Sequence, residues 1–97
     1  MLAWKWGYLV VYQVFYTETA VKDIENLKAA YLDETAKTLI ELIKKDPYQT
    51  PPTYEKLLGD LQGLYSRRIN IKHRLAYEVY EEENIIKIVS LWSYYKR

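Results

Sequence analysis

Five basic residues lie between positions 67 and 74, and no carboxylate interrupts them: Arg67, Arg68, Lys72, His73 and Arg74. Their neighbours are β-branched or aromatic at roughly alternating spacing, which is typical of β-strands. Because side chains alternate between the two faces of a strand, we expect Arg68 and Arg74 on one face. Two rigidly held guanidinium groups that face the same way suit the phosphates of RNA or another polyanion. The simpler alternative is a pair of solvated arginines beside an acidic turn.

Bulk composition limits the kinds of protein that this chain can be. At 97 residues, 49% of them apolar, it has enough material for one domain with a single core. The net charge is only +1, so affinity for nucleic acid has to come from the uneven distribution of charge. Cysteine is absent, which excludes thiol nucleophiles and cysteine-ligated zinc and is compatible with a cytoplasmic location. With one histidine and no cysteine, a transition-metal site would have to be mostly carboxylate, and no cluster suggests one, so we predict neither a metal nor another cofactor.

The first half of the chain predicts a strand followed by two helices. Residues 8–16 form a β-branched and aromatic run, which favours a buried strand over a secretion signal. Thr17 or Thr19 can cap the helix that follows, and Asp33 is expected to cap a second helix. Lysines at 44–45 and Pro47 mark the end of that second helix. Residues 1–7 are expected to be an N-terminal extension, and residues 8–97 a single domain.

The second half predicts a long loop and three strands. The loop spans residues 47–63, with a helical turn expected at 54–58. Strands are expected near 64–71, 73–80 and 85–93. The order β-α-α-β-β-β predicts an α+β fold, in which an N-terminal helical hairpin packs on one face of a twisted antiparallel sheet.

The basic stretch also carries a resemblance. Residues 57–70 read LLGDLQGLYSRRIN, and residues 73–77 read HRLAY. They resemble the Txe/YoeB branch of the RelE toxin superfamily, whose pattern reads roughly L-x-G-x-L-x-G-[YWF]-[YW]-S-R-R-I-x-x-x-H-R-L-V-Y. Leu64 and Ala76 are mild departures. The resemblance covers about residues 14 to 95, which is nearly the whole chain.

The resemblance implies a RelE-like fold and a toxin of a type II toxin–antitoxin system. Such toxins are ribosome-dependent endoribonucleases that cut messenger RNA by attack of a 2′-hydroxyl on the adjacent phosphate, without a metal. The expected partners are a cognate antitoxin, the ribosome and mRNA, with a homodimer or a toxin–antitoxin heterocomplex as assembly. No membrane is implied, and the expected location is the cytoplasm.

The resemblance also implies roles for individual residues. Glu55 falls where the family places its general base, and Arg68 and Arg74 match its phosphate-binding arginines. Near the C-terminus, Tyr94 and Tyr95 match the pair in which the family typically has His-Tyr. His73 matches a histidine that is not catalytic. Further substrate contacts are expected from Arg67, Tyr65 and Lys56. Strict alternation, however, turns Arg67 to the opposite face of the strand from Arg68.

Tyr94 is the departure that leaves the function open. A phenol with an ordinary pKa of about 10 donates a proton less readily at neutral pH than an imidazolium does. Full activity, weakened activity, an altered mechanism and inactivity are all compatible with the sequence. The leading hypothesis is an active toxin, and the second is an impaired homologue that binds its antitoxin as a co-repressor. The third is an RNA-binding domain that uses Arg68 and Arg74 only as phosphate contacts.

Overall fold

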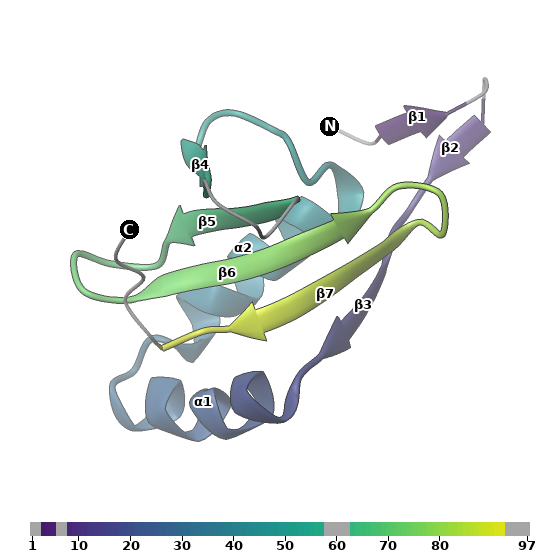
Figure 1. Cartoon of the computed structure of the whole chain (residues 1–97). Helices are drawn as coiled ribbons and strands as arrows, with labels where there is room; N and C mark the ends of the chain where they lie inside the picture. Colours follow the sequence, from purple (N-terminus) through teal and green to yellow (C-terminus); the bar gives the residue numbers. More distant parts are fainter. Residues whose placement is uncertain (1–2, 6–7, 58–62, 93–97) are drawn as a thin grey trace.

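The computed structural model describes residues 3–5, 8–57 and 63–92. Its main element is a five-stranded sheet in the order β3-β7-β6-β5-β4 (Figure 1). The strands are β3 (Gln13–Tyr16), β4 (Tyr54–Lys56), β5 (Leu64–Arg68), β6 (Arg74–Tyr80) and β7 (Ile85–Ser90). Two consecutive helices, α1 (Glu18–Ala29) and α2 (Asp33–Lys45), connect β3 to the remaining strands. The α+β class predicted from the sequence is confirmed.

The sheet is mixed, which corrects the expectation of a purely antiparallel one. β4, β5, β6 and β7 pair antiparallel in sequence order, but β3 pairs parallel to β7. The reason is topological. After β3, the helices carry the chain across the sheet to the opposite edge, and the strands then return one by one until β7 meets β3.

The strand predicted for residues 8–16 is divided in two. β2 (Tyr8–Val10) pairs antiparallel with β1 (Ala3–Lys5), and these two strands form a sheet of their own. The break falls at Val11 and Tyr12, where the Tyr12 backbone N–H donates to the Lys44 carbonyl at 3.0 Å instead of joining a ladder. Tyr12 is buried, so this turn of the chain brings an aromatic side chain into the core.

Both helices begin and end for identifiable local reasons. Thr17 caps α1, because its hydroxyl accepts from the Ala20 N–H at 3.0 Å. α1 ends where Tyr31 adopts a left-handed conformation (φ 60°), so that the Leu32 N–H reaches back to the Leu27 carbonyl at 2.8 Å. Leu32, and not Asp33 as predicted, is the N-cap of α2, and it has no side-chain cap bond. Asp33 lies in the first turn instead, where its charge favours the helix dipole.

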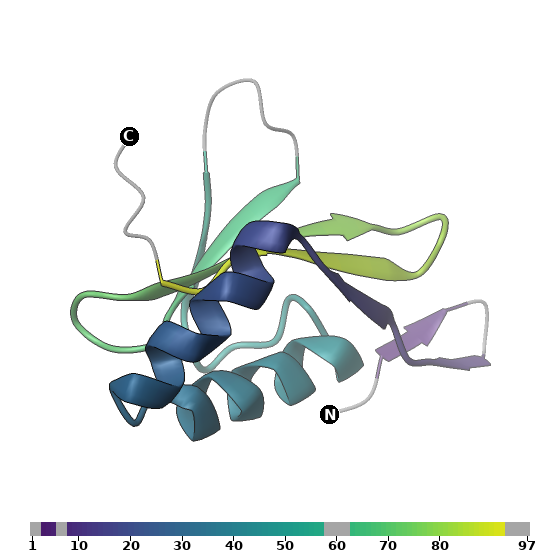
Figure 2. The same ribbon diagram turned by 90° about the horizontal axis from the view of Figure 1, so that it is seen from below.

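The helices cover one face of the sheet, as Figure 2 shows. The core lies between them and the sheet: α1 and α2 contribute Ala20, Leu27, Ala36, Leu39, Ile40 and Ile43, and the strands contribute Leu75, Tyr77, Ile86 and Ile88. A separate, smaller cluster contains Leu57, Leu64 and Ala76. Leu64 and Ala76 alternate with the core-facing residues of β5 and β6, so this cluster lies on the sheet face without helices. Neither described helix is long and apolar enough to cross a membrane.

Two further predictions need correction. The helical turn expected at 54–58 is the short strand β4, which pairs with β5 at the edge of the sheet. β5 ends at Arg68, three residues earlier than predicted, because the chain turns there. The Asn70 side-chain oxygen accepts from the backbone N–H groups of Lys72 (2.9 Å) and His73 (2.7 Å), which closes the turn into β6.

Candidate functional site

Arg68 and Arg74 are directly opposite each other on neighbouring strands. Arg68 is the last residue of β5, Arg74 is the first residue of β6, and the two are register partners. Both alternate with core-facing residues, so both belong to the sheet face without helices. Like charges opposite each other on a strand pair are destabilising. This cost is offset where an anion lies against the pair.

Glu55 supplies one such negative charge. It pairs with Ser66 in the β4–β5 ladder and therefore lies on the same face as Arg68. The Arg74 Nη1 atom lies 3.3 Å from the Glu55 Oε1 atom. The Arg74 side chain is 15% exposed and that of Glu55 is 49% exposed, so the pair lies at the boundary between protein and solvent. A half-exposed ion pair of this length is weak and can exchange for another partner.

A hollow of about 410 Å³ brings these groups together. It is lined by Pro52, Thr53, Tyr54, Glu55, Ser66, Arg68 and Arg74. The charged lining consists of two guanidinium groups and one carboxylate, so the hollow favours an anion. Its volume falls in the range of about 300–1,000 Å³ that is usual for ligand sites.

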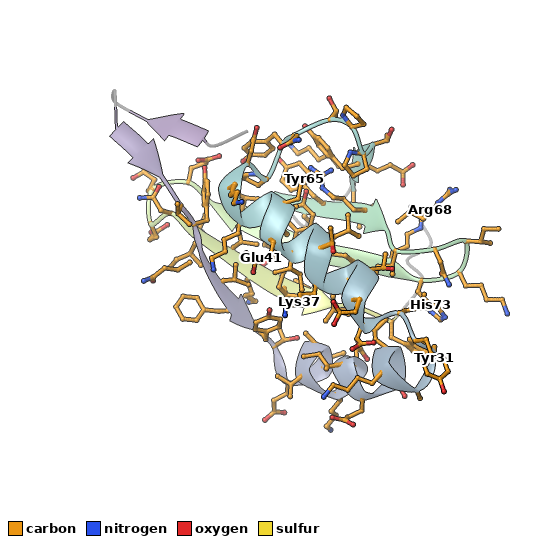
Figure 3. All side chains as sticks on the ribbon, turned by 180° about the vertical axis from the view of Figure 1, so that it is seen from behind. Tyr31, Lys37, Glu41, Tyr65, Arg68 and His73 are labelled. Carbon is orange, nitrogen blue, oxygen red and sulfur yellow. The ribbon has the colours of Figure 1, made fainter. Side chains whose placement is uncertain are left out.

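The three residues expected to add substrate contacts lie on the other face. Tyr65 and Arg67 alternate with Ser66 and Arg68, and Lys56 is the register partner of Tyr65. None of the three lines the hollow. Figure 3 shows Tyr65 beside α2 and Arg68 farther along, near the end of the sheet with His73. Arg67 has no exposed surface, so the expected substrate contact of Arg67 is corrected. The period of two also turns Tyr65 and Lys56 toward the helix side, and the substrate contacts of these two residues stay predictions.

Arg67 is a structural residue in the interior, with no exposed surface. Its guanidinium group donates to the carbonyls of Pro52 (2.7 Å), Gln49 (2.9 Å) and Pro47 (3.0 Å). Its Nε–H donates to the hydroxyl of Tyr77 at 3.0 Å, and that hydroxyl donates to the Pro47 carbonyl at 2.8 Å. One buried side chain thus holds the loop that leads into β4, and Glu55 is the second residue of that strand.

Four tyrosines pack around this loop. The Tyr65 ring lies 5.5 Å from that of Tyr48, 5.6 Å from that of Tyr54 and 5.7 Å from that of Tyr77. The Arg67 guanidinium lies 4.9 Å above the Tyr54 ring. Burial raises the pKa of Tyr77 to about 12, although the nearby Arg67 charge acts in the opposite direction. Tyr65 therefore belongs to an aromatic cluster that supports the loop.

Glu81 fixes the same region from the turn between β6 and β7. Its two carboxylate oxygens accept hydrogen bonds from Tyr12 (2.7 Å) and Tyr48 (2.5 Å). Burial, together with these hydrogen bonds, raises the pKa of both tyrosines. Two side chains therefore hold the loop before Glu55. Arg67 binds its backbone carbonyls, and Glu81 binds the hydroxyl of Tyr48.

His73 contacts the segment that follows β7. Its Nδ1 atom lies 2.8 Å from the Trp92 carbonyl oxygen, and the two rings stack with their centroids 3.7 Å apart. Because a carbonyl can only accept, Nδ1 carries the proton in this contact. His73 thus packs against Trp92, and the non-catalytic role expected for it stays a prediction. Tyr94 and Tyr95 lie outside the described residues.

Asp23 of α1 holds the same segment from the helix side. This buried carboxylate accepts from the backbone N–H groups of Leu91 at 2.9 Å and Trp92 at 3.3 Å. Asp23 and His73 together anchor the chain just before its last five residues. Sequence reasoning missed Asp23, because a carboxylate within an amphipathic helix looks like a solvated charge.

Ser66 is the other residue that sequence reasoning missed. It lines the hollow between Glu55 and the two arginines. The signal was present in the alternation of β5, which puts residue 66 on the same face as Arg68. Pro52 and Thr53 also line the hollow, but nothing in their pattern predicts it. Within the described ranges, no group of three or more His, Asp or Glu side chains could hold a metal ion.

Comparisons with known proteins find matches over most of the chain. Residues 16–95 match the family described as the YoeB-like toxin of bacterial type II toxin–antitoxin systems. A curated relative, toxin YoeB of Synechocystis sp., is 37% identical over 59 residues, which are 61% of this chain and 66% of that protein. The chain spans about half to two thirds of the length of the curated relatives that it matches.

Solved structures of similar proteins share the fold. A YoeB/ParE toxin from Agrobacterium tumefaciens superposes with a TM-score of 0.77 at 27% identity, covering 86% of this chain and 99% of that one. YoeB in a YoeB–YefM complex from Staphylococcus aureus superposes with a TM-score of 0.72 at 30% identity, covering 87% of this chain and 98% of that one.

Proposed function

Because this chain belongs to the YoeB-like toxin family, we propose that it is an endoribonuclease that cleaves mRNA on the translating ribosome. The reaction is attack of a ribose 2′-hydroxyl on the adjacent phosphate, which leaves a 2′,3′-cyclic phosphate and a free 5′-hydroxyl. It needs a base for the attacking hydroxyl, cations for the charge that develops on the phosphate, and an acid for the leaving oxygen. No metal takes part.

The two arginines bind the scissile phosphate and stabilise its transition state. Arg68 and Arg74 are register partners on one face, so both guanidinium groups can contact the oxygens of a single phosphate. The phosphate also removes the cost of holding two like charges opposite each other. Loss of one such contact typically reduces the rate by about 10² to 10³.

Glu55 is the general base. It lies 3.3 Å from Arg74, so its carboxylate is beside the phosphate that the arginines hold. When the phosphate engages Arg74, it replaces the weak ion pair, and the Glu55 carboxylate accepts the proton of the 2′-hydroxyl. This grouping of Glu55 and Arg74 with Arg68 in one hollow is the observation that carries the proposal.

Tyr94 supplies the proton to the leaving oxygen, and Tyr95 orients the substrate. Both assignments rest on the family pattern. A phenol is a slower acid than imidazolium at neutral pH. We therefore propose an active enzyme in which replacing Tyr94 by histidine raises the rate.

We further propose that a small antitoxin protein binds this chain in the cytoplasm. The support is the family and the similar Staphylococcus aureus structure, in which YoeB is in complex with YefM. Copurification with the product of a neighbouring small gene, expressed from its natural operon, tests this part. Failure of the two proteins to copurify, or growth arrest that the neighbour does not relieve, contradicts it.

Cleavage is tested in a cell-free translation system with primer-extension mapping of the message. The parent chain should produce cuts that require translating ribosomes and that end in a 2′,3′-cyclic phosphate. Arg68→Met and Glu55→Gln should each abolish most cleavage while folding normally, since both side chains are at the surface. An unchanged message with the parent chain and with Tyr94→His contradicts the proposal. Cleavage that appears only with Tyr94→His indicates an impaired homologue.

A further inference from the structure

Two buried serine hydroxyls have no hydrogen-bond partner among the described residues. They are the Oγ atoms of Ser66 and Ser90, whose residues are 1% and 2% exposed. Native proteins pair most of their buried polar groups, because an unpaired one loses its hydration without compensation. A buried hydroxyl without a protein partner is therefore a candidate for a hydrogen bond to a bound ligand.

The two serines differ in their relation to the hollow. Ser66 lines it, together with Glu55 and the two arginines, whereas Ser90 does not. Ser66 is the register partner of Glu55 on one side and of Ala76 on the other. It precedes Arg68 by two residues on the same strand, which is a separation of about 7 Å along the sheet face.

We propose that the Ser66 hydroxyl donates a hydrogen bond to a non-bridging oxygen of the RNA phosphate held by Arg68 and Arg74. This inference rests on the proposed function and adds a substrate contact to it. A serine hydroxyl is both donor and acceptor, so a phosphate oxygen satisfies its donor. No described residue pairs with the Ser66 hydroxyl, so a phosphate oxygen can take this donor without displacing a protein partner.

Ser66→Ala and Ser90→Ala form a matched pair of variants. Each removes one buried, unpaired hydroxyl from the same row of the sheet, because Ala76 pairs with both serines. We expect both variants to be as stable toward urea as the parent chain, or more stable, since neither loses a hydrogen bond. A clear loss of stability in Ser66→Ala alone would show that its hydroxyl is a structural group and would overturn the proposal.

Cleavage in the cell-free system separates the two variants. Ser66→Ala should lower kcat/KM by about 10- to 100-fold, as expected for a lost hydrogen bond to a charged oxygen. Ser90→Ala should cleave like the parent chain. Equal activity of the two variants would overturn the proposal, because the hydroxyl would then make no contact that matters for the reaction.

A binding assay distinguishes failure of this inference from failure of the proposed function. The probe is a short RNA with a 2′-deoxy sugar at its central position, bound in the presence of ribosomes. The central phosphate is intact, but 2′ attack on it is blocked. If the parent chain binds this RNA without cleaving normal RNA, the proposed catalysis fails, and a weaker affinity of Ser66→Ala still supports the phosphate contact. Equal affinities of Ser66→Ala, Ser90→Ala and the parent chain overturn the contact, as does a parent chain that binds no RNA.

Discussion

Replacing Arg67 by methionine should destabilise this protein far more than the same replacement of its neighbour Arg68. The Arg67 guanidinium donates four hydrogen bonds in the interior, three of them to loop carbonyls and one to Tyr77. A hydrogen bond from a charged group contributes about 1.5–3 kcal/mol, so the four sum to roughly 6–12 kcal/mol before any correction. Removing the charge also removes the cost of burying it, which is several kcal/mol.

The net loss expected for Arg67→Met is therefore about 3–5 kcal/mol of the free energy of unfolding. That is a large share of the roughly 5–15 kcal/mol that a domain possesses. Arg67→Lys should be nearly as costly, because lysine keeps the buried charge but lacks the planar fork that reaches separate carbonyls. Arg68→Met should change stability by only about 0.5 kcal/mol, since Arg68 is exposed at the end of its strand.

Urea unfolding followed by tryptophan fluorescence and by circular dichroism measures these differences. The slope of free energy against urea should stay constant between the parent chain and the variants, so that only the midpoint moves. A loss below about 1 kcal/mol in Arg67→Met would refute the reasoning, because exposed surface sites give changes of that size. An equal loss in Arg68→Met would also refute it, since the argument depends on the two arginines having opposite environments.

Three further predictions concern stability. Because burial raises the pKa of Tyr77 to about 12, its contribution to stability should be constant below pH 10 and should fall by about 2–3 kcal/mol as the pH rises through 12. Tyr12 and Tyr48, whose pKa values are also raised, should add to this fall. Unfolding in urea at each pH measures the profile, and a flat profile would contradict the prediction. Tyr31→Gly should stabilise the chain by about 1 kcal/mol in thermal unfolding, because glycine adopts the left-handed conformation of this 91%-exposed position without strain. Tyr31→Ala should change stability little. Equal effects of the two substitutions would refute the role of strain. Asp23→Ala should lower the free energy of unfolding by about 2–4 kcal/mol, because the backbone N–H groups of Leu91 and Trp92 lose their acceptor. Glu25→Ala, at an exposed position of the same helix, is the control. Similar losses in both variants would show that the Asp23 carboxylate makes no special contribution.

Local periodicity was sufficient for much of the site. The alternation of side chains along a strand already predicted that Arg68 and Arg74 share a face and that Arg67 faces away from them. It also contained the position of Ser66, which sequence reasoning overlooked. Helix signals located α1 and α2, because capping hydroxyls, a terminal proline and apolar spacing act over a few neighbouring residues.

Contacts between distant segments were beyond the reach of such signals. The strand at Glu55 was expected to be a helical turn, since a strand of three residues carries too little periodicity to be identified as an edge strand. The sequence likewise contained no indication that β3 would join the sheet parallel to β7, because strand order depends on where the helices carry the chain.

The sequence by itself determined the α+β class, the family pattern and the shared face of two arginines, because each of these depends on residue types at fixed local spacing. Only the tertiary structure decided that Glu55 forms an ion pair with Arg74, and that Arg67 is buried against the loop and not accessible to RNA. The physical reason is that cross-strand register and loop closure are set by the packing of the whole domain. A residue's neighbours along the chain do not specify which side chain lies opposite it in space.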